Sequence, residues 1–226
     1  MKSFHPLGVL RMASSSWFPL AFLASLCLVK NGHLFCNADP TDGFTPVPLT
    51  EGDFDIQKPY DKPLQDRYSY INGVHKMWVY STDKPFKPGS PTKPRTEIRI
   101  RGHDYSSGVW QFEGYGFVPE GTTGTSIMQI LGSDGPILML KVYDGQLNYH
   151  SQKLVEPNIY NRWMRVNVIH DVDANKLTVF INGVQKLEVE GRGPSTFYFK
   201  CGVYTQTDPS HYMESRWKNI RVLKKN

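Results

Sequence analysis

Residues 94–101 alternate charged and apolar side chains and carry the clearest candidate chemistry in this sequence. On a β-strand this period of two places the charged residues on one face and the Thr and Ile residues on the other. The charged set is Arg95, Glu97, Arg99 and Arg101. Burying such a face without partners is costly, so we expect it to line a groove or to reach solvent. Three guanidiniums beside one carboxylate favour an anion-binding site.

A second alternating stretch, residues 197–206, offers groups that complement those guanidiniums. Its apolar members are Phe197, Phe199, Cys201 and Val203. Its polar members supply two phenols, an ammonium and an amide around a central glycine, and they are Tyr198, Lys200, Gly202, Tyr204 and Gln206. A glycine leaves room at the centre of such a face. The two stretches are therefore predicted to form two halves of one polar binding groove.

Short alternating runs separated by turn residues predict the fold. They cover residues 68–80, 96–101, 109–118, 126–131, 137–143, 146–150, 163–170, 176–181, 185–189, 197–204 and 216–223. Asn-Gly or Asp-Gly pairs at 72–73, 144–145 and 182–183 predict tight hairpins. No stretch of ten or more residues shows a clean helical period. The sequence predicts an all-β chain, a β-jelly-roll sandwich of two sheets, as a single domain over 39–226 with an extended, Pro-rich start over 39–63.

The first 38 residues are predicted to be a signal peptide. Lys2 and Arg11 precede an apolar block from Trp17 to Val29, and small residues lead up to Ala38. That order is typical of a secretory signal, with a retained anchor as the alternative, and no membrane span is expected in the mature chain. Removing the signal takes three basic residues and no acidic one, so the net charge falls from +5 to +2. This small charge gives no indication of nucleic-acid binding.

Metal, redox and cofactor chemistry find no support in the sequence. Cys201 is the one cysteine beyond residue 38 and is predicted to be a buried thiol. Residues 171–175 begin like a calcium loop but have Lys176 where that loop needs glycine, so they predict a polar turn. We therefore expect no metal and no cofactor. Aromatic residues within 110–117 are predicted to be core, with sugar stacking as the alternative.

Three segments identify a family resemblance. Residues 95–99, 126–131 and 198–206 occur in the order of the signature strands of the alginate-lyase-2 jelly roll, polysaccharide lyase family 7, and the resemblance spans most of residues 39–226. It implies a jelly-roll fold and β-elimination on a uronate polysaccharide. It also implies roles for individual residues, with carboxylate neutralisation by Arg95 and Gln129, catalysis by Tyr204, and substrate contacts by Lys200 and Gln206.

One position departs from that family pattern. The family has Gln, then Ile or Val, then His, whereas this chain has Leu131 in the third place. Elimination needs carboxylate neutralisation, a base and an acid. Without the imidazole, we expect lyase activity to be weakened, although Tyr204 could still serve as both acid and base for one substrate stereochemistry.

What remains after the loss of the imidazole is a carboxylate clamp. The chain also resembles plant citrate-binding proteins, including residues 39–46, and that resemblance implies citrate as ligand and the vacuole as destination. We predict non-catalytic binding of citrate or a related polycarboxylate. The alternatives are a lyase acting on a uronate polymer and a non-catalytic cell-wall carbohydrate binder, which would be extracellular. The predicted ligand contacts are Arg95, Arg99, Gln129, Lys200, Tyr204 and Gln206, with Glu97 and Tyr198 in support.

Overall fold

The structure is a computed structural model that describes residues 28–30, 33–35 and 38–225. The chain divides into two compact units, residues 1–38 and 39–226. In the first, β1 (Leu28–Lys30) and β2 (His33–Phe35) form an antiparallel pair. Most of the predicted signal peptide lies outside the described residues, so that assignment stays a prediction. Within the described ranges, no helix has the length and apolar character needed to cross a membrane.

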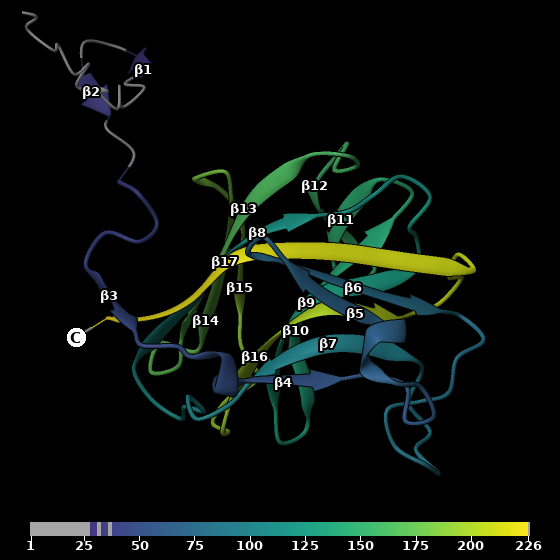
Figure 1. The fold of residues 1–226 in the computed structure, drawn as a ribbon. Helices are drawn as coiled ribbons and strands as arrows, with labels where there is room; N and C mark the ends of the chain where they lie inside the picture. The colour runs from purple at the N-terminus through teal and green to yellow at the C-terminus, as the bar shows by residue number, and fades with distance from the viewer. Residues whose placement is uncertain (1–27, 31–32, 36–37, 226) are drawn as a thin grey trace, which may run out of the picture. The chain divides into compact units, whose positions relative to one another are not determined.

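The second unit is built from two antiparallel sheets, and Figure 1 shows their strands. The seven-stranded sheet has the order β12-β11-β10-β9-β16-β7-β4. Its strands are β4 (Phe54–Gln57), β7 (Arg95–Ile100), β9 (Thr125–Gly132), β10 (Gly135–Tyr143), β11 (Gln146–Tyr149), β12 (Lys153–Glu156) and β16 (Tyr198–Thr205).

The eight-stranded sheet has the order β15-β14-β13-β8-β17-β6-β5, with β3 paired to β17. Its strands are β3 (Phe44–Val47), β5 (Tyr68–Ile71), β6 (Val74–Tyr80), β8 (Val109–Phe117), β13 (Trp163–Asp171), β14 (Lys176–Ile181), β15 (Val184–Glu190) and β17 (Tyr212–Lys225). Two short 3-10 turns, η1 (Glu51–Asp53) and η2 (Leu64–Asp66), lie near the start of this unit.

The core lies between the apolar faces of the two sheets. Phe199 and Cys201 of β16 are buried on one side, and Phe112 of β8 and Trp217 of β17 are buried on the other. The Phe112 ring centroid is 6.0 Å from that of Phe199 and 5.6 Å from that of Trp217, so the aromatic rings join the two layers. Removing these large apolar groups from water is the main stabilising contribution to such a sandwich. The predicted all-β jelly roll and the buried thiol of Cys201 are confirmed.

The three predicted hairpin turns are also confirmed. At Asn72 and Gly73 the φ angles are 51° and 76°, and the pairs at 144–145 and 182–183 have the same left-handed conformation. Positive φ at both central residues defines the type I′ turn, whose twist matches that of the flanking strands. These turns connect β5 to β6, β10 to β11 and β14 to β15.

Three strands of the second unit lie outside the predicted runs. β3 and β4 fall in the stretch predicted to be extended, and β12 falls in a stretch to which the pattern gave no structure. β4 and β12 are the outer strands of the seven-stranded sheet. β3 contains Pro46, and proline in a sheet is tolerated mainly on edge strands, where its missing N–H costs little. Short edge strands need little periodicity, which explains why the alternation did not predict them.

Candidate functional site

The signature strands lie side by side in the seven-stranded sheet. In the ladder, Lys200 of β16 is opposite Arg99 of β7 on one side and opposite Gln129 of β9 on the other. Tyr204 is opposite Arg95 in the same ladder. Because directly opposed residues in a sheet share a face, these predicted site residues lie together on one face, which we call the signature face.

Glu97 occupies the centre of the signature face. Its carboxylate accepts a hydrogen bond from Lys200 Nζ at 2.6 Å, another from Arg95 Nη1 at 3.3 Å, and a third from Gln129 Nε2. The Glu97 and Lys200 side chains are only 1% and 2% exposed. The chain's own carboxylate thus holds the cations that the sequence assigned to a ligand.

This ion-pair cluster corrects one expectation from the sequence. The charged face was expected to reach solvent or line a groove, because a buried charge needs a partner. Glu97 is that partner, so Arg95, Glu97 and Lys200 are buried instead. Burial lowers the pKa of Lys200, while the Glu97 carboxylate opposes that change by favouring the ammonium. The Glu97 carboxylate thus offsets part of the cost of burying the Lys200 ammonium.

Arg95 retains unused hydrogen-bonding capacity. Its guanidinium carbon lies 3.8 Å from the centroid of the Tyr204 ring, a close cation–π stack. Among the described residues its buried Nε has no hydrogen-bond partner, and its one hydrogen bond is the 3.3 Å contact with Glu97. A guanidinium has five N–H donors in a planar fork. Most of the Arg95 fork thus has no acceptor among the described residues.

Arg99 is more open than Arg95. Its guanidinium stacks over the Tyr198 ring at 4.2 Å and donates to Asp104 Oδ2 at 2.6 Å. The Arg99 side chain is 20% exposed and that of Asp104 is 35% exposed, so solvent and ligands reach this pair. Asp104 was not predicted, because it lies in the loop after β7, where no alternation marks it. Glu97, which the sequence placed in a supporting role, forms its arginine ion pair with Arg95 and not with Arg99.

Two further positions limit what the signature face can do. The side-chain amide of Gln206 donates to the backbone carbonyls of Tyr204 and Thr205, at 3.2 Å and 2.9 Å, and so folds onto its own strand. Leu131 is opposite Tyr198 in the ladder and therefore lies on the signature face near Gln129. The place where the family pattern has an imidazole is occupied by an aliphatic side chain.

Gly202 has a different role from the one predicted. The sequence suggested that it leaves room for a ligand, but a Cβ there would lie 2.4 Å from the Thr96 carbonyl oxygen and 2.6 Å from Glu97 Cα. The neighbouring strand β7 fills the space. The φ angle of 144° also lies in a region that favours glycine. Gly202 therefore permits the close approach of β16 to β7 that brings Lys200 to Glu97.

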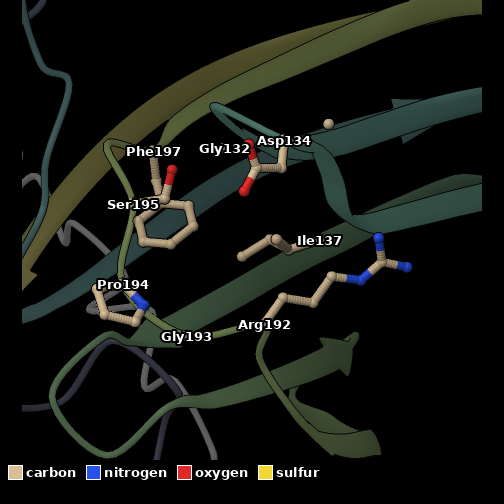
Figure 2. Close-up of a pocket in the computed structure, with 9 residues that line it drawn as sticks. Gly132, Asp134, Ile137, Arg192, Gly193, Pro194, Ser195 and Phe197 are labelled. Atoms are coloured by element: carbon tan, nitrogen blue, oxygen red, sulfur yellow. The ribbon is translucent and has the colours of Figure 1, made fainter.

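Four surface hollows of the described residues are lined by residues other than Arg95, Glu97 and Lys200. Among those of the described residues, one lies beside Arg67 and Asp83, and another lies along β14 near Phe44. Two more share Arg192 in their lining, and Figure 2 shows the smaller of these. Arg192 was not among the predicted site residues.

Comparisons with known proteins agree with this architecture. The sequence profile of the alginate lyase family matches residues 47–224. A citrate-binding protein from Hevea brasiliensis is 61% identical over 207 residues, which cover 90% of this chain and 87% of that protein.

Solved structures of family 7 lyases share the fold. Alginate lyase AlgAT5 superposes with a TM-score of 0.59 at 18% identity, covering 82% of this chain and 98% of that one. The family 7 alginate lyase A1-II′, solved as a variant with substrate, gives a TM-score of 0.61 at 17% identity, covering 77% and 94%. Identities this low show a common fold and no more, but the profile match covers most of the sequence. The chain belongs to the alginate lyase family.

Proposed function

We propose that this chain binds citrate or a related small polycarboxylate and does not catalyse elimination. The observation that carries the proposal is the unused hydrogen-bonding capacity of Arg95 on a face that has Leu131 in place of the family's imidazole. The 61% identical relative named as a citrate-binding protein supports the same ligand.

The binding geometry rests on two arginines. Arg95 and Arg99 project from the same face of β7 four residues apart, a spacing of about 13 Å along a strand, with Glu97 between them. Each is stacked on a tyrosine, Tyr204 or Tyr198, which fixes the plane of its guanidinium. A guanidinium fork binds a carboxylate with two parallel hydrogen bonds. Each of the two forks can therefore bind one ligand carboxylate.

Lys200 and Gln129 act indirectly in this arrangement. Both donate to Glu97: the Lys200 ammonium neutralises its charge and the Gln129 amide satisfies its other oxygen, which together reduce the repulsion of an anion at the centre of the face. The clamp predicted from the sequence, in which Lys200 meets a ligand carboxylate directly, is replaced in our proposal by one centred on Arg95 and Arg99.

Calorimetric titration with citrate tests the proposal. We expect saturable binding by the wild type and at least tenfold weaker binding by an Arg95→Gln, Arg99→Gln variant, because a charge-assisted hydrogen bond contributes about 1.5–3 kcal/mol. Arg101→Gln is the matched control. It removes the same charge just beyond β7, where Arg101 pairs with Asp55 and its side chain is 60% exposed. No binding by the wild type at millimolar citrate would refute the proposal.

A lyase acting on a uronate polymer is the second candidate, favoured by the family membership and by the presence of Arg95, Gln129 and Tyr204 on one face. Incubation with alginate separates the two functions, because elimination creates an unsaturated uronate that absorbs in the ultraviolet. Accumulation of that product, and its loss in Tyr204→Phe, would establish catalysis. A wall-polysaccharide binder would instead be retained on the polymer in a way that citrate does not compete.

We also propose that the protein enters the secretory pathway and resides in the vacuole. The support is the basic and apolar pattern of residues 1–38 together with the resemblance to citrate-binding proteins. A fluorescent fusion to the full chain tests this against a fusion lacking residues 1–38. Vacuolar fluorescence is expected only for the first, and signal in the cell wall would contradict the vacuolar destination.

A further inference from the structure

A second concentration of basic groups lies at the edge of the sandwich, away from the signature strands. There the turn between β11 and β12 meets β15 and the segment after it. They surround a hollow of about 520 Å³. Its lining residues are Tyr149, His150, Ser151, Gln152, Lys153, Val189 and Arg192. Two of these side chains are permanently cationic at neutral pH, and none is acidic.

The cations around this hollow are not paired with carboxylates. Within residues 38–225, no ion pair joins Lys153, Arg192 or the nearby Lys141 to an acidic side chain. Lys141 Nζ lies 3.4 Å from Ser151 Oγ, which places it at the same turn. In Figure 2 the Arg192 side chain extends past Ile137, and its guanidinium points away from the Asp134 carboxylate. The hollow therefore carries positive charge that the described part of the protein does not neutralise.

His150 is held in an unusual conformation at the wall of this hollow. Its φ angle is 51°, a left-handed conformation that costs a non-glycine residue roughly 1 kcal/mol or more. Its backbone N–H donates to the Met139 carbonyl at 2.8 Å, and its ring packs edge-on against Tyr149 at 4.4 Å. These contacts fix the ring in place, yet its buried Nε2 has no hydrogen-bond partner among the described residues.

The electrostatics of His150 agree with an anion-attracting site. Burial lowers the pKa of the imidazole first, the positive charges of Lys141 and Arg192 lower it further, and an interaction with the Ile137 backbone partly opposes them. Lys153, on the adjoining strand β12, adds a third cation to the same hollow. A positive potential that repels a proton from an imidazole also attracts an anion to it.

We propose that this hollow is a second anion site, which binds a small polycarboxylate through Arg192, Lys153 and the Nε2–H of His150. The two cations meet separate carboxylates, and the imidazole donates the hydrogen bond that Nε2 lacks. β11 is separated from β7, which carries Arg95 and Arg99, by β10, β9 and β16, four strand spacings or about 19 Å. That separation is too long for one small polyacid to span, so the site is independent of the Arg95 and Arg99 clamp.

The test follows the His150 ring signals by NMR during titration with citrate, inorganic phosphate and chloride at constant ionic strength. Citrate is expected to give a saturable shift and to raise the pKa of His150 by about one unit, as an opposite charge at close range does. Arg192→Gln and Lys153→Gln each weaken citrate binding at this site at least tenfold. Arg216→Gln, which removes a cation from the eight-stranded sheet, leaves it unchanged.

Three results would overturn the proposal. An equal effect of chloride would mean general screening, and phosphate binding as tight as citrate binding would contradict the carboxylate preference. Loss of the His150 response in the Arg95→Gln, Arg99→Gln variant would mean that the hollow is not an independent site. The same variant separates this proposal from the proposed binding at Arg95 and Arg99. If it loses citrate binding at the signature face but keeps the His150 response, the second site is supported independently.

Discussion

The buried ion pair at the centre of the signature face leads to a quantitative prediction. Glu97 and Lys200 are almost completely buried, with 2.6 Å between Oε2 and Nζ. Lys200→Met removes the closer of the two cations on that carboxylate and leaves it with Arg95 at 3.3 Å and with the Gln129 amide. Deleting one member of a buried pair costs about 3–5 kcal/mol of unfolding free energy. Because Arg95 remains beside Glu97, we expect a loss of about 3 kcal/mol.

The second half of the prediction concerns the double variant. Adding Glu97→Gln to Lys200→Met removes both charges of the pair and keeps similar side-chain volumes, although Arg95 then loses its carboxylate partner. Replacement of a whole buried pair is often close to neutral. We expect the double variant to recover at least about 2 kcal/mol of the loss. The two substitutions are therefore expected to be strongly non-additive, as contacting residues usually are.

Urea unfolding at neutral pH measures the unfolding free energies of the wild type, the single variants and the double variant. An unchanged m-value, the slope of that free energy against urea concentration, shows that the folded state is intact. Lys76→Met is the control. Lys76 pairs with Glu214 at 3.2 Å but is 37% exposed, so its loss should cost below about 1 kcal/mol. A similarly small loss of unfolding free energy for Lys200→Met, or additive effects in the double variant, would show that Lys200 and Glu97 are not energetically coupled as a buried ion pair.

Three more predictions follow from other residues. Glu97→Gln should tighten citrate binding at the signature face, because it removes a competing carboxylate, and unchanged or weaker calorimetric affinity would contradict this. Burial lowers the pKa of His75 and His170 to about 4. Since the unfolded value is about 6.5, stability is complete above that pH and declines as pH falls towards 4, by about 2 kcal/mol for each residue at pH 5. Equal unfolding free energies at pH 7.5 and 5 would argue against buried, neutral imidazoles. Gly202→Ala should cost at least about 2 kcal/mol through its φ of 144° and the contact with β7, measured by urea unfolding, and wild-type stability would exclude that close approach.

Local pattern predicted most of the fold because strands and hairpins leave short-range signals. Asn72 and Gly73 adopt positive φ because of their own residue types, so the turn can be recognised from these two residues. The alternation in 95–101 and 197–206 can likewise be recognised without knowing which strands are neighbours, because any strand with one buried face shows it. β12 could not be predicted in the same way, because its position depends on pairing with β11. Edge strands of this kind are specified by their neighbours more than by their own residues.

The local sequence pattern could not predict the side-chain contacts within the site. Glu97 and Lys200 are 103 positions apart. Whether that carboxylate meets a lysine, an arginine or water depends on the register of β16 against β7. The Asp104 partner of Arg99 and the left-handed His150 lie in loops, where no periodicity indicates which way a side chain points. The sequence thus identified which groups share a face, and the structure was needed to show which of them bond to one another.

Glu97 decides which cations of the signature face can bind an external anion. A carboxylate fixed in the same sheet has a far higher effective concentration at Lys200 than any free acid, because its translational freedom was lost when the protein folded. A dissolved polycarboxylate therefore cannot displace it at Lys200 and binds where donors remain, at the Arg95 fork and at Arg99. The same reasoning bears on elimination, since a substrate carboxylate would compete with Glu97 for Arg95 and Gln129. Restoring an imidazole by Leu131→His would consequently leave carboxylate neutralisation incomplete unless Glu97 were also replaced.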